Sequence, residues 1–434
     1  MSLPIREAAK TSILSMKWRD KWRGLPNLVF DHFSFQVSPG NAALSRAKVL
    51  FNIYQVLLLH RGPIPKFTLS IPELGSCPEI DQLVFFLRDK HIQEFTFHSW
   101  GMGRHKLPSS FFSYEQLRHL NLAFCLLKAP PTFGGFSRLI SVEFQAVDFA
   151  SNVFESFISK CPLLEQLTID DCPNIGCLEI DAPNLKSLTF HGVFESICFK
   201  NAPRLDFVVI DSILQLHGEN AMYNKGHASN MIKVLEGLPA IEYLCIGYLF
   251  LKYMAVGKSP QRFPANINHL RVIEVPNMCF GKMEDVSCIL CLIMSSPNLQ
   301  KLELAATCFE DAAATDVLEL FEDQELSDDS LKQLQEVWIN SFIGEAAELE
   351  FVKFLLAKSV VLEKILIQPP PGIVAEEGLN ILRRLTRFRR ASSKAEIIYV
   401  NPDEDRATIV SPVDVCYQLG PKTDAIKSEL QSVA

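Results

Sequence analysis

A few short patterns in this sequence contain residue types that can bind metal ions or phosphate groups. Cys288 and Cys291 have the spacing of half a zinc site, but no second pair of Cys or His follows at zinc-finger distance. The Gly-Lys-Ser sequence at 257–259 resembles the end of a phosphate-binding loop, although Lys252 stands where that loop needs a glycine. We therefore expect no metal site and no cofactor.

Residues that could act in catalysis are present but scattered. His98 and His105 flank a glycine turn, which we interpret as a surface loop, and Cys172 and Cys177 fall in a turn between two predicted strands. Neither the Gly-x-Ser-x-Gly sequence of hydrolases nor the His-Glu-x-x-His sequence of zinc proteases occurs. The sequence predicts no catalytic residues, and we expect that the protein is not an enzyme.

Composition excludes several classes of partner. The 434 residues have a formal net charge of −8, whereas binding to nucleic acid favours a basic balance. The 12 cysteines are scattered and no secretory signal opens the chain, which favours reduced thiols. No apolar run reaches the roughly 20 residues that span a bilayer. We expect a protein of the cytoplasm, the nucleus or both, without membrane or nucleic-acid partners.

The most informative feature is a recurring six-residue apolar pattern. It reads Leu-Arg-His-Leu-Asn-Leu at 117–122 and Leu-Glu-Gln-Leu-Thr-Ile at 164–169. Further copies begin at 185, 205, 241, 270, 299, 334 and 362, and looser copies begin at 92, 139, 175 and 194. One such unit cannot bury its apolar side alone, so neighbouring units must stack.

Alternation within each hexamer predicts a strand, and helical patterns separate many of the hexamers. These predicted helices are residues 52–60, 81–89, 152–159, 284–294 and 348–356. Between 164 and 205 the spacing is too short for a helix, and we expect the copies at 175 and 194 to be short return strands. The predicted fold is an α/β leucine-rich-repeat solenoid, with a curved parallel sheet, return helices and short return strands.

Three segments together resemble the plant F-box proteins that carry leucine-rich repeats and an FBD domain. Residues 3–15, Leu-Pro-Ile-Arg-Glu-Ala-Ala-Lys-Thr-Ser-Ile-Leu-Ser, are similar to the second half of the F-box, and Trp18 and Trp22 follow them. Residues 161–167, Cys-Pro-Leu-Leu-Glu-Gln-Leu, are similar to the repeats. Residues 348–356, Glu-Leu-Glu-Phe-Val-Lys-Phe-Leu-Leu, are similar to the FBD signature.

The resemblance implies a division into domains. Residues 1–40 are expected to hold a short helical F-box remnant and a linker, with the first half of the F-box missing. Residues 41–329 are expected to form leucine-rich repeats, 330–400 FBD-like repeats, and 401–434 a weakly ordered tail.

The resemblance also implies a function. An F-box docks on the Skp-type adaptor of a cullin–RING ubiquitin ligase of the SCF type, while the repeats hold a target protein. The implied adaptor contacts are Leu3, Pro4, Ile5, Ile13, Leu14, Trp18 and Trp22. Because the F-box is incomplete, the alternative is a leucine-rich-repeat interaction scaffold without a link to the ligase. Trp18 and Trp22 could equally pack against the first repeat.

The strand pattern also predicts a surface for the unidentified target. Residues between the core positions of each hexamer point to the opposite side of the sheet. Four apolar residues among them suggest either a binding hot spot or a patch covered by another segment, and both interpretations remain open. The residues expected to contact a partner are His119, Asn121, Gln166, Thr168, Asp170, Thr189, His191, Phe207, Val209, Tyr243 and Trp338.

Overall fold

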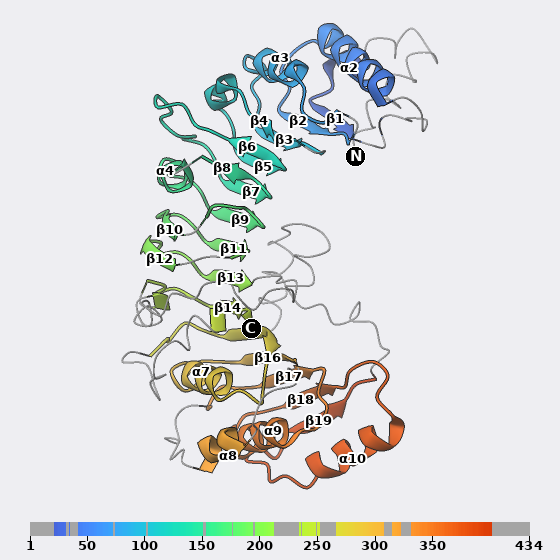
Figure 1. The fold of residues 1–434 in the computed structure, drawn as a ribbon. Coiled ribbons are helices and arrows are strands. Elements are labelled where there is room, and N and C mark those ends of the chain that lie inside the picture. Colours follow the sequence, from blue (N-terminus) through green and yellow to red (C-terminus); the bar gives the residue numbers. More distant parts are fainter. Residues whose placement is uncertain are drawn as a thin grey trace. The chain divides into compact units, whose positions relative to one another are not determined.

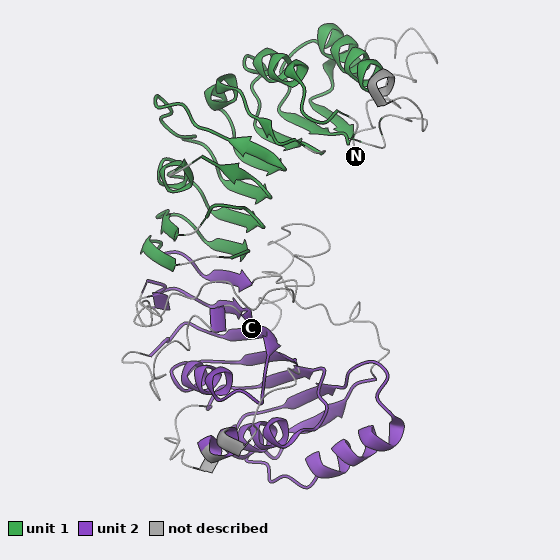
Figure 2. Cartoon of the chain, in the orientation of Figure 1, with its two compact units in different colours: residues 1–203 green, residues 204–434 purple. Residues whose placement is uncertain are grey.

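The structure is a computed structural model, and the chain divides into two compact units, residues 1–203 and 204–434 (Figure 2). The residues that it describes are 21–31, 34, 42–72, 74–100, 103–150, 153–175, 177–193, 196–211, 234–235, 237–248, 250–251, 266–307, 315–322 and 331–401. Each unit repeats a strand and a return segment, so the α/β leucine-rich-repeat fold is confirmed. None of the described helices is long and apolar enough to cross a membrane.

Parallel strands form the framework of the first unit (Figure 1). In order across the sheet they are β1 (Asn27–Asp31), β2 (Lys66–Ser70), β3 (Glu94–His98), β5 (His119–Ala123), β7 (Ser141–Gln145), β9 (Gln166–Asp170) and β11 (Ser187–His191). Strands begin two residues after the first apolar residue of a hexamer. That residue is buried in the preceding turn, where the Leu117 N–H donates to Tyr114 O and the Leu164 N–H to Cys161 O. β1 lies within residues 1–40, where we expected a linker.

Two kinds of return segment cover the other side of these strands. The helices are η1 (Lys21–Gly24), α2 (Ala42–Leu59), α3 (Pro78–Leu87), η2 (Ser109–Ser113) and α4 (Val153–Ser159). The short strands are β4 (His105–Lys106), β6 (Cys125–Leu127) and β8 (Asp148–Phe149), which pair with one another, and β10 (Cys177–Asp181) with β12 (Ser196–Asn201). The last pair confirms the predicted return strands. Proline at the first turn of α3, with Glu79 and Asp81, fits the backbone and dipole of a helix start.

Phenylalanine fills the core between the strands and their return segments. Phe67 and Phe95 occupy the same register position on β2 and β3, and their rings stack at 6.1 Å. Phe111, from η2, lies edge-on to Phe136 at 5.6 Å. Each ring contacts rings of neighbouring repeats, so burial is shared between repeats, as stacking of incomplete units requires.

The second unit is built on a second run of parallel strands. They are β13 (Phe207–Asp211), β14 (Tyr243–Ile246), β15 (Val272–Met278), β16 (Lys301–Ala306), β17 (Glu336–Asn340), β18 (Lys364–Gln368) and β19 (Glu396–Tyr399). Its helices include α7 (Met283–Met294), α8 (Thr315–Glu322), α9 (Ala346–Lys358) and α10 (Ala375–Leu385). The FBD-like residues thus continue the alternation of strand and helix. The domain boundaries that we expected at 40, 329 and 400 remain predictions.

Helix α9 begins with a capping box that the sequence analysis did not identify. Glu345 caps the helix, and the Glu348 side chain accepts bonds from the backbone N–H groups of Ile343 (3.1 Å), Gly344 (2.6 Å) and Glu345 (3.0 Å). Gly344 has φ = 80°, and a β-carbon there would lie 2.6 Å from Ile381 Cγ1. This junction therefore depends on a glycine and on one buried carboxylate.

Candidate functional site

One face of the first unit carries polar side chains on four neighbouring strands. We call it the polar face, and it consists of Glu94, Thr96, His98, His119, Asn121, Ser141, Glu143, Gln145, Gln166, Thr168 and Asp170. Intervening residues such as Phe95 and Leu120 are buried in the core. Strands β3, β5, β7 and β9 pair in register without a bulge, so equivalent side chains form straight rows across the sheet.

A chain of hydrogen bonds crosses this face. Trp100 Nε1 donates to Ser70 Oγ (3.1 Å), and Ser70 Oγ lies 3.0 Å from His98 Nδ1. His98 Nε2 lies 2.8 Å from Asn121 Oδ1, and Asn121 Nδ2 donates to Glu143 Oε2 (2.6 Å). Because the amide oxygen must accept, His98 donates from Nε2 and accepts the Ser70 hydroxyl at Nδ1. The five side chains are thus held in one donor-to-acceptor order.

Electrostatics distinguish the two ends of this chain. Burial lowers the pKa of His98, so its ring is neutral near pH 7, although the bond to Asn121 acts in the other direction. Burial also raises the pKa of Glu143, and the negative charge of Asp170 raises it further. Asn121 opposes that rise by donating to the carboxylate. The Glu143 carboxylate is therefore held by Asn121 on β5 and lies in the field of the Asp170 charge on β9.

Most residues predicted to contact a partner in this unit lie where the pattern placed them. His119, Asn121, Gln166, Thr168 and Asp170 all belong to the polar face. Two further bonds order it: His119 Nδ1 lies 2.7 Å from Ser141 Oγ, and Gln145 Nε2 donates to Asp170 Oδ2 (3.1 Å). Partner binding by these residues remains a prediction.

The strand at the end of this face departs from the prediction. Thr189 and His191 are buried, as is every other residue of β11. Alternation of polar and apolar residues predicts which side chains are exposed only where one side of the strand faces solvent. Both sides of β11 are covered, so these two residues are not available on an exposed surface.

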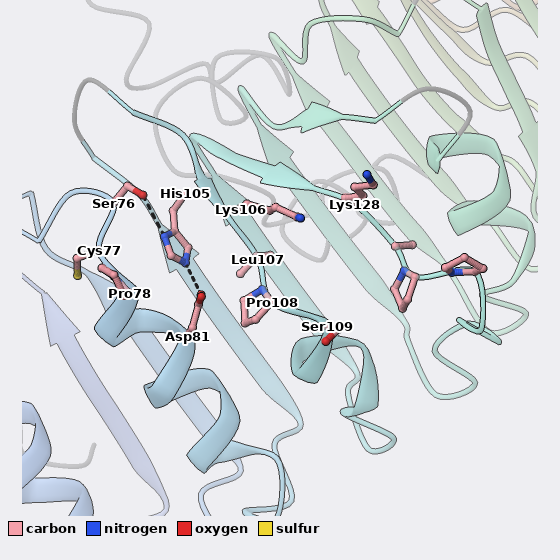
Figure 3. A pocket seen from close by; sticks show the side chains of 13 residues that line it. Ser76, Cys77, Pro78, Asp81, His105, Lys106, Leu107, Pro108, Ser109 and Lys128 are labelled. Carbon is pink, nitrogen blue, oxygen red and sulfur yellow. Dashed lines mark hydrogen bonds and ion pairs between the residues drawn. The ribbon is translucent and has the colours of Figure 1, made fainter.

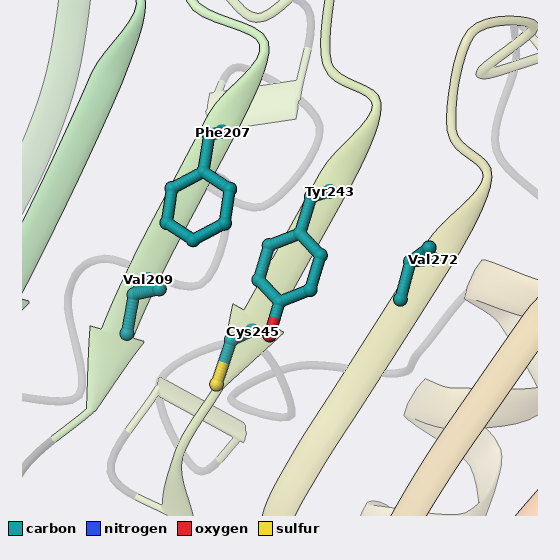
Figure 4. Packing of buried hydrophobic residues seen from close by; sticks show 5 residues of the cluster. All are labelled: Phe207, Val209, Tyr243, Cys245 and Val272. Carbon is teal, nitrogen blue, oxygen red and sulfur yellow. The ribbon is translucent and has the colours of Figure 1, made fainter. Parts of the chain in front are cut away.

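In the second unit, the apolar residues expected on the surface are buried instead. Phe207, Val209 and Tyr243 form a cluster with Cys245 and Val272 (Figure 4). The Phe207 and Tyr243 rings are stacked, with centroids 4.4 Å apart and an interplanar angle of 9°. Of the two interpretations left open by the sequence, this burial agrees with the covered patch. Phe207 pairs with Tyr243 and Tyr243 with Val272, so apolar side chains of adjacent strands also pack against one another.

Polar groups border this cluster. The Tyr243 hydroxyl donates to Glu274, and burial raises the pKa of Tyr243 well above its usual value, with a further contribution from the Glu274 charge. Trp338, also expected on the surface, is buried with Leu366 and Val400. Nearby, Lys301 pairs with Glu303 at 2.5 Å. Within the described residues, this face is therefore packed rather than exposed.

Most of the implied adaptor-binding residues lie outside the described residues. They are Leu3, Pro4, Ile5, Ile13, Leu14 and Trp18. Trp22 is described, and it is half-buried in η1 with the Arg23 guanidinium 5.8 Å from its ring centre. Two backbone contacts join this segment to the end of α2. The Arg61 N–H donates to Arg23 O (2.6 Å), and His60 Nε2 lies 2.9 Å from Leu25 O.

A pocket of about 570 Å³ lies on the return-segment side of the first unit (Figure 3). His105 lies between two of its lining residues, with Nδ1 3.2 Å from Ser76 Oγ and Nε2 3.0 Å from Asp81 Oδ1. We expected His105 in a surface loop, but it is buried in β4, edge-on to the Phe97 ring at 5.7 Å. The short return strand β4 lies outside the hexamers, so the hexamer pattern did not predict it.

The order Ser76, His105, Asp81 has the residue types of a nucleophile, a base and an orienting acid. Burial lowers the pKa of His105, whereas Asp81 raises it. The Asp81 side chain is 51% exposed, so it orients the ring far less firmly than a buried carboxylate would. Since the ring also packs on Phe97, this arrangement joins β4 to α3.

The cysteine pair with metal-like spacing is buried within α7. Cys288 and Cys291 are both reduced thiols, and burial raises the pKa of Cys288 well above its usual value. Across the described part of the chain, no group of three or more Cys, His, Asp or Glu could hold a metal ion. These cysteines act as small apolar side chains of the core.

Comparisons with known proteins cover most of the chain. The family model described as "FBD-associated F-box protein At5g56370, LRR repeats" matches residues 80–304. F-box/FBD/LRR-repeat protein At1g13570 of Arabidopsis thaliana is 35% identical over 400 residues, covering 92% of this chain and 94% of that protein. F-box/LRR-repeat protein 13 of the same plant is 25% identical over 441 residues, covering 92% of both chains.

Proposed function

We propose that this chain, which belongs to the F-box/FBD/LRR-repeat protein family, is the substrate-recognition subunit of an SCF-type cullin–RING ubiquitin ligase. Residues 3–22 would hold the Skp-type adaptor and through it the cullin, and the repeats would hold a target protein. Such a subunit performs no bond chemistry, and it acts by holding the target near the enzyme that carries ubiquitin. We place it in the cytoplasm, the nucleus or both.

The observation that carries this proposal is the polar face of the first unit. It is an ordered surface of hydrogen-bonding side chains on rigid parallel strands, such as Asn121 on β5 and Glu143 on β7. Side chains that are already fixed lose little freedom when a partner binds, which favours recognition. The proposed ligase connection rests on the family, because the names of the relatives above contain "F-box".

Two measurements test the two halves of the proposal. The first is co-purification of the full chain with a Skp-type adaptor, in comparison with a Leu14→Glu/Trp18→Ala variant. We expect the adaptor to bind the wild type and to be lost from the variant. If no adaptor binds the wild type, the chain is the alternative, a repeat scaffold without a link to the ligase.

The second measurement identifies targets by proximity labelling in plant cells. We compare the wild type with Asn121→Ala/Glu143→Ala on the polar face. The matched control is Glu179→Ala/Lys200→Ala, which removes an exposed ion pair of 2.5 Å on the return strands of the same unit. We expect labelled targets to be lost with the first variant only. Equal labelling by both variants would show that targets bind elsewhere.

A further inference from the structure

Basic side chains gather at one end of the second unit, where α9 and α10 finish. These helices lead into β18 and β19, which pair in parallel and in register, so both helices lead to the same edge of the sheet. The Ala391 N–H donates to Leu356 O (2.8 Å), which fixes the segment after α10 against the end of α9. We call this surface the basic end, and its exposed cations are Lys358, Arg383, Arg387, Arg389, Arg390 and Lys394.

Some of the basic side chains in this region support the fold. Arg384 Nη1 donates to Gly344 O (3.1 Å), and Arg390 Nη1 donates to Ala395 O (2.6 Å). Lys358 and Arg383 lie in the last turns of their helices, where a positive charge is favourable to the helix dipole. These contacts explain part of the basic end but not all of it.

Two arginines of the basic end have no such role. Arg387 and Arg389 both follow the last residue of α10, and both are exposed. Within the described residues, neither guanidinium forms an ion pair or a hydrogen bond. Both groups are therefore available to a partner that carries negative charge.

Carboxylates border the basic end and limit the size of that partner. They are Glu345 at the start of α9, Glu376 and Glu377 at the start of α10, Glu363 before β18 and Glu396 in β19. In the described part of the chain, none of them forms an ion pair with a cation of the basic end. A long nucleic acid or an anionic bilayer would extend past the cations onto these carboxylates and be repelled, whereas a short acidic segment would not.

Exposed apolar side chains lie among the cations. Leu379 is 48% exposed, and Leu379, Arg383 and Arg387 are spaced four residues apart, so they form one row along α10 and the turn after it. Val360, which is 56% exposed, lies two residues after Lys358. The partner that fits carries carboxylates and apolar side chains together, as a segment of protein does and a phosphate backbone does not.

We infer that the basic end docks a short acidic segment of a protein partner, with carboxylates on Arg387 and Arg389 and apolar side chains on Leu379 and Val360. Arginine suits this role because its planar guanidinium can bind a carboxylate through two hydrogen bonds. The inference goes beyond the proposed function, since it requires neither the adaptor nor the polar face. It gives the FBD-like residues a binding role of their own.

The test is binding of a fluorescein-labelled peptide of glutamate and leucine to the full chain, measured by fluorescence anisotropy. Arg387→Glu/Arg389→Glu reverses both available charges, and we expect the affinity to fall by about tenfold or more. Arg387→Gln/Arg389→Gln removes the charges without reversing them and should weaken binding by less. Added salt should weaken binding to the wild type, because interactions between exposed charges are screened.

The matched control is Arg138→Glu/Arg271→Glu, which makes the same change of charge at two exposed arginines outside the basic end. We expect this variant to bind the peptide nearly as well as the wild type does. Circular dichroism of every variant checks that the fold is retained.

Several results would overturn the inference. They are a wild type that does not bind the peptide, a reversal variant that binds as tightly as the wild type, and an equal loss in the control. Single-stranded RNA and phosphatidylserine vesicles are measured in parallel. If either binds more tightly than the peptide and the reversal variant loses that binding, the partner is a nucleic acid or a membrane instead.

Sedimentation tests whether a second copy of the chain covers the basic end. A dimer that the reversal variant alone fails to form would show that it does, and would also overturn the inference. None of these outcomes depends on the adaptor, so the proposed function is tested separately.

Discussion

Glu348 at the start of α9 is a position where one substitution should test the local energetics of the second unit. Its carboxylate is 2% exposed and accepts three backbone N–H groups at 3.1, 2.6 and 3.0 Å. Glu348→Ala leaves these donors without a partner in a buried turn. At about 1 kcal/mol or more for each lost bond, we expect the unfolding free energy to fall by about 3 kcal/mol.

The same carboxylate should make stability depend on pH. Burial raises the pKa of Glu348 to about 7, and the three backbone bonds act in the other direction. A carboxyl whose pKa is raised by folding stabilises the protein below its ordinary pKa, and this stabilisation is lost as pH rises through about 7. Each tenfold change in the ionisation constant corresponds to about 1.4 kcal/mol. We therefore expect the unfolding free energy to fall by about 2–3 kcal/mol between pH 5 and 8.

Hydrogen exchange of peptides covering residues 341–350 measures this local stability directly. We compare the wild type with Glu348→Ala, with Glu348→Gln, which cannot ionise, and with Glu350→Ala. Glu350 is a suitable control because it bonds Lys353 at the surface of the same helix, at 2.8 Å. Glu348→Gln should remove the pH-dependent loss of protection. If wild type and Glu348→Gln change in parallel between pH 5 and 8, the raised pKa is wrong. If Glu348→Ala matches Glu350→Ala, the capping argument fails.

Two further substitutions have matched controls or a defined partner. Gly135 has φ = 99°, and a β-carbon there would lie 1.9 Å from Lys160 O, so Gly135→Ala should reduce the unfolding free energy by about 2 kcal/mol or more. Gly134→Ala, with nothing within 4 Å, should cost much less in the same urea titration. Tyr243→Phe removes the hydroxyl that donates to buried Glu274, and we expect a loss of about 1–3 kcal/mol by urea unfolding. A Tyr243→Phe variant as stable as the wild type would show that this bond contributes little.

The strands could be predicted from the sequence because each hexamer must bury its leading apolar residue and its two alternating ones. Leu117, Leu120 and Leu122 are all buried, and the same positions are buried at Leu164, Leu167 and Ile169. The pattern is repeated on neighbouring strands that pair in register. A shift of one strand by one residue would therefore misalign its apolar side chains with those of its neighbours.

What covers the opposite side of each strand could not be predicted in the same way. Thr168 and Val209 occupy equivalent positions in their hexamers, yet Thr168 is on an open face and Val209 is buried. Alternation gives the direction of a side chain but not what lies against it. The aromatic stack of Phe207 on Tyr243 arises between strands whose sequences are more than 30 residues apart, and no local pattern contains it.

Hydrogen bonds between side chains of different repeats could not be predicted from the sequence either. Ser70, His98 and Asn121 belong to three strands, and their order depends on the register of all three. The capping box at α9 is different, because Glu345 and Glu348 stand three residues apart before an apolar run. A Glu at the cap position is less usual than Ser, Thr, Asp or Asn, which explains why it was missed.

The two units use the equivalent side of their strands in different ways, and this has a consequence for recognition. In the first unit, Asn121 orients the Glu143 carboxylate on a face that is still accessible, so a partner meets side chains that are already ordered. In the second unit, Tyr243 and Glu274 satisfy each other within a buried cluster, and their bond contributes to packing instead. A partner could contact Tyr243 and Glu274 only by disrupting the apolar packing around them, which costs free energy. Contact with Asn121 and Glu143 carries no such cost. Among the described residues, recognition should therefore depend on β3, β5, β7 and β9, whereas substitutions around Tyr243 should act mainly through stability.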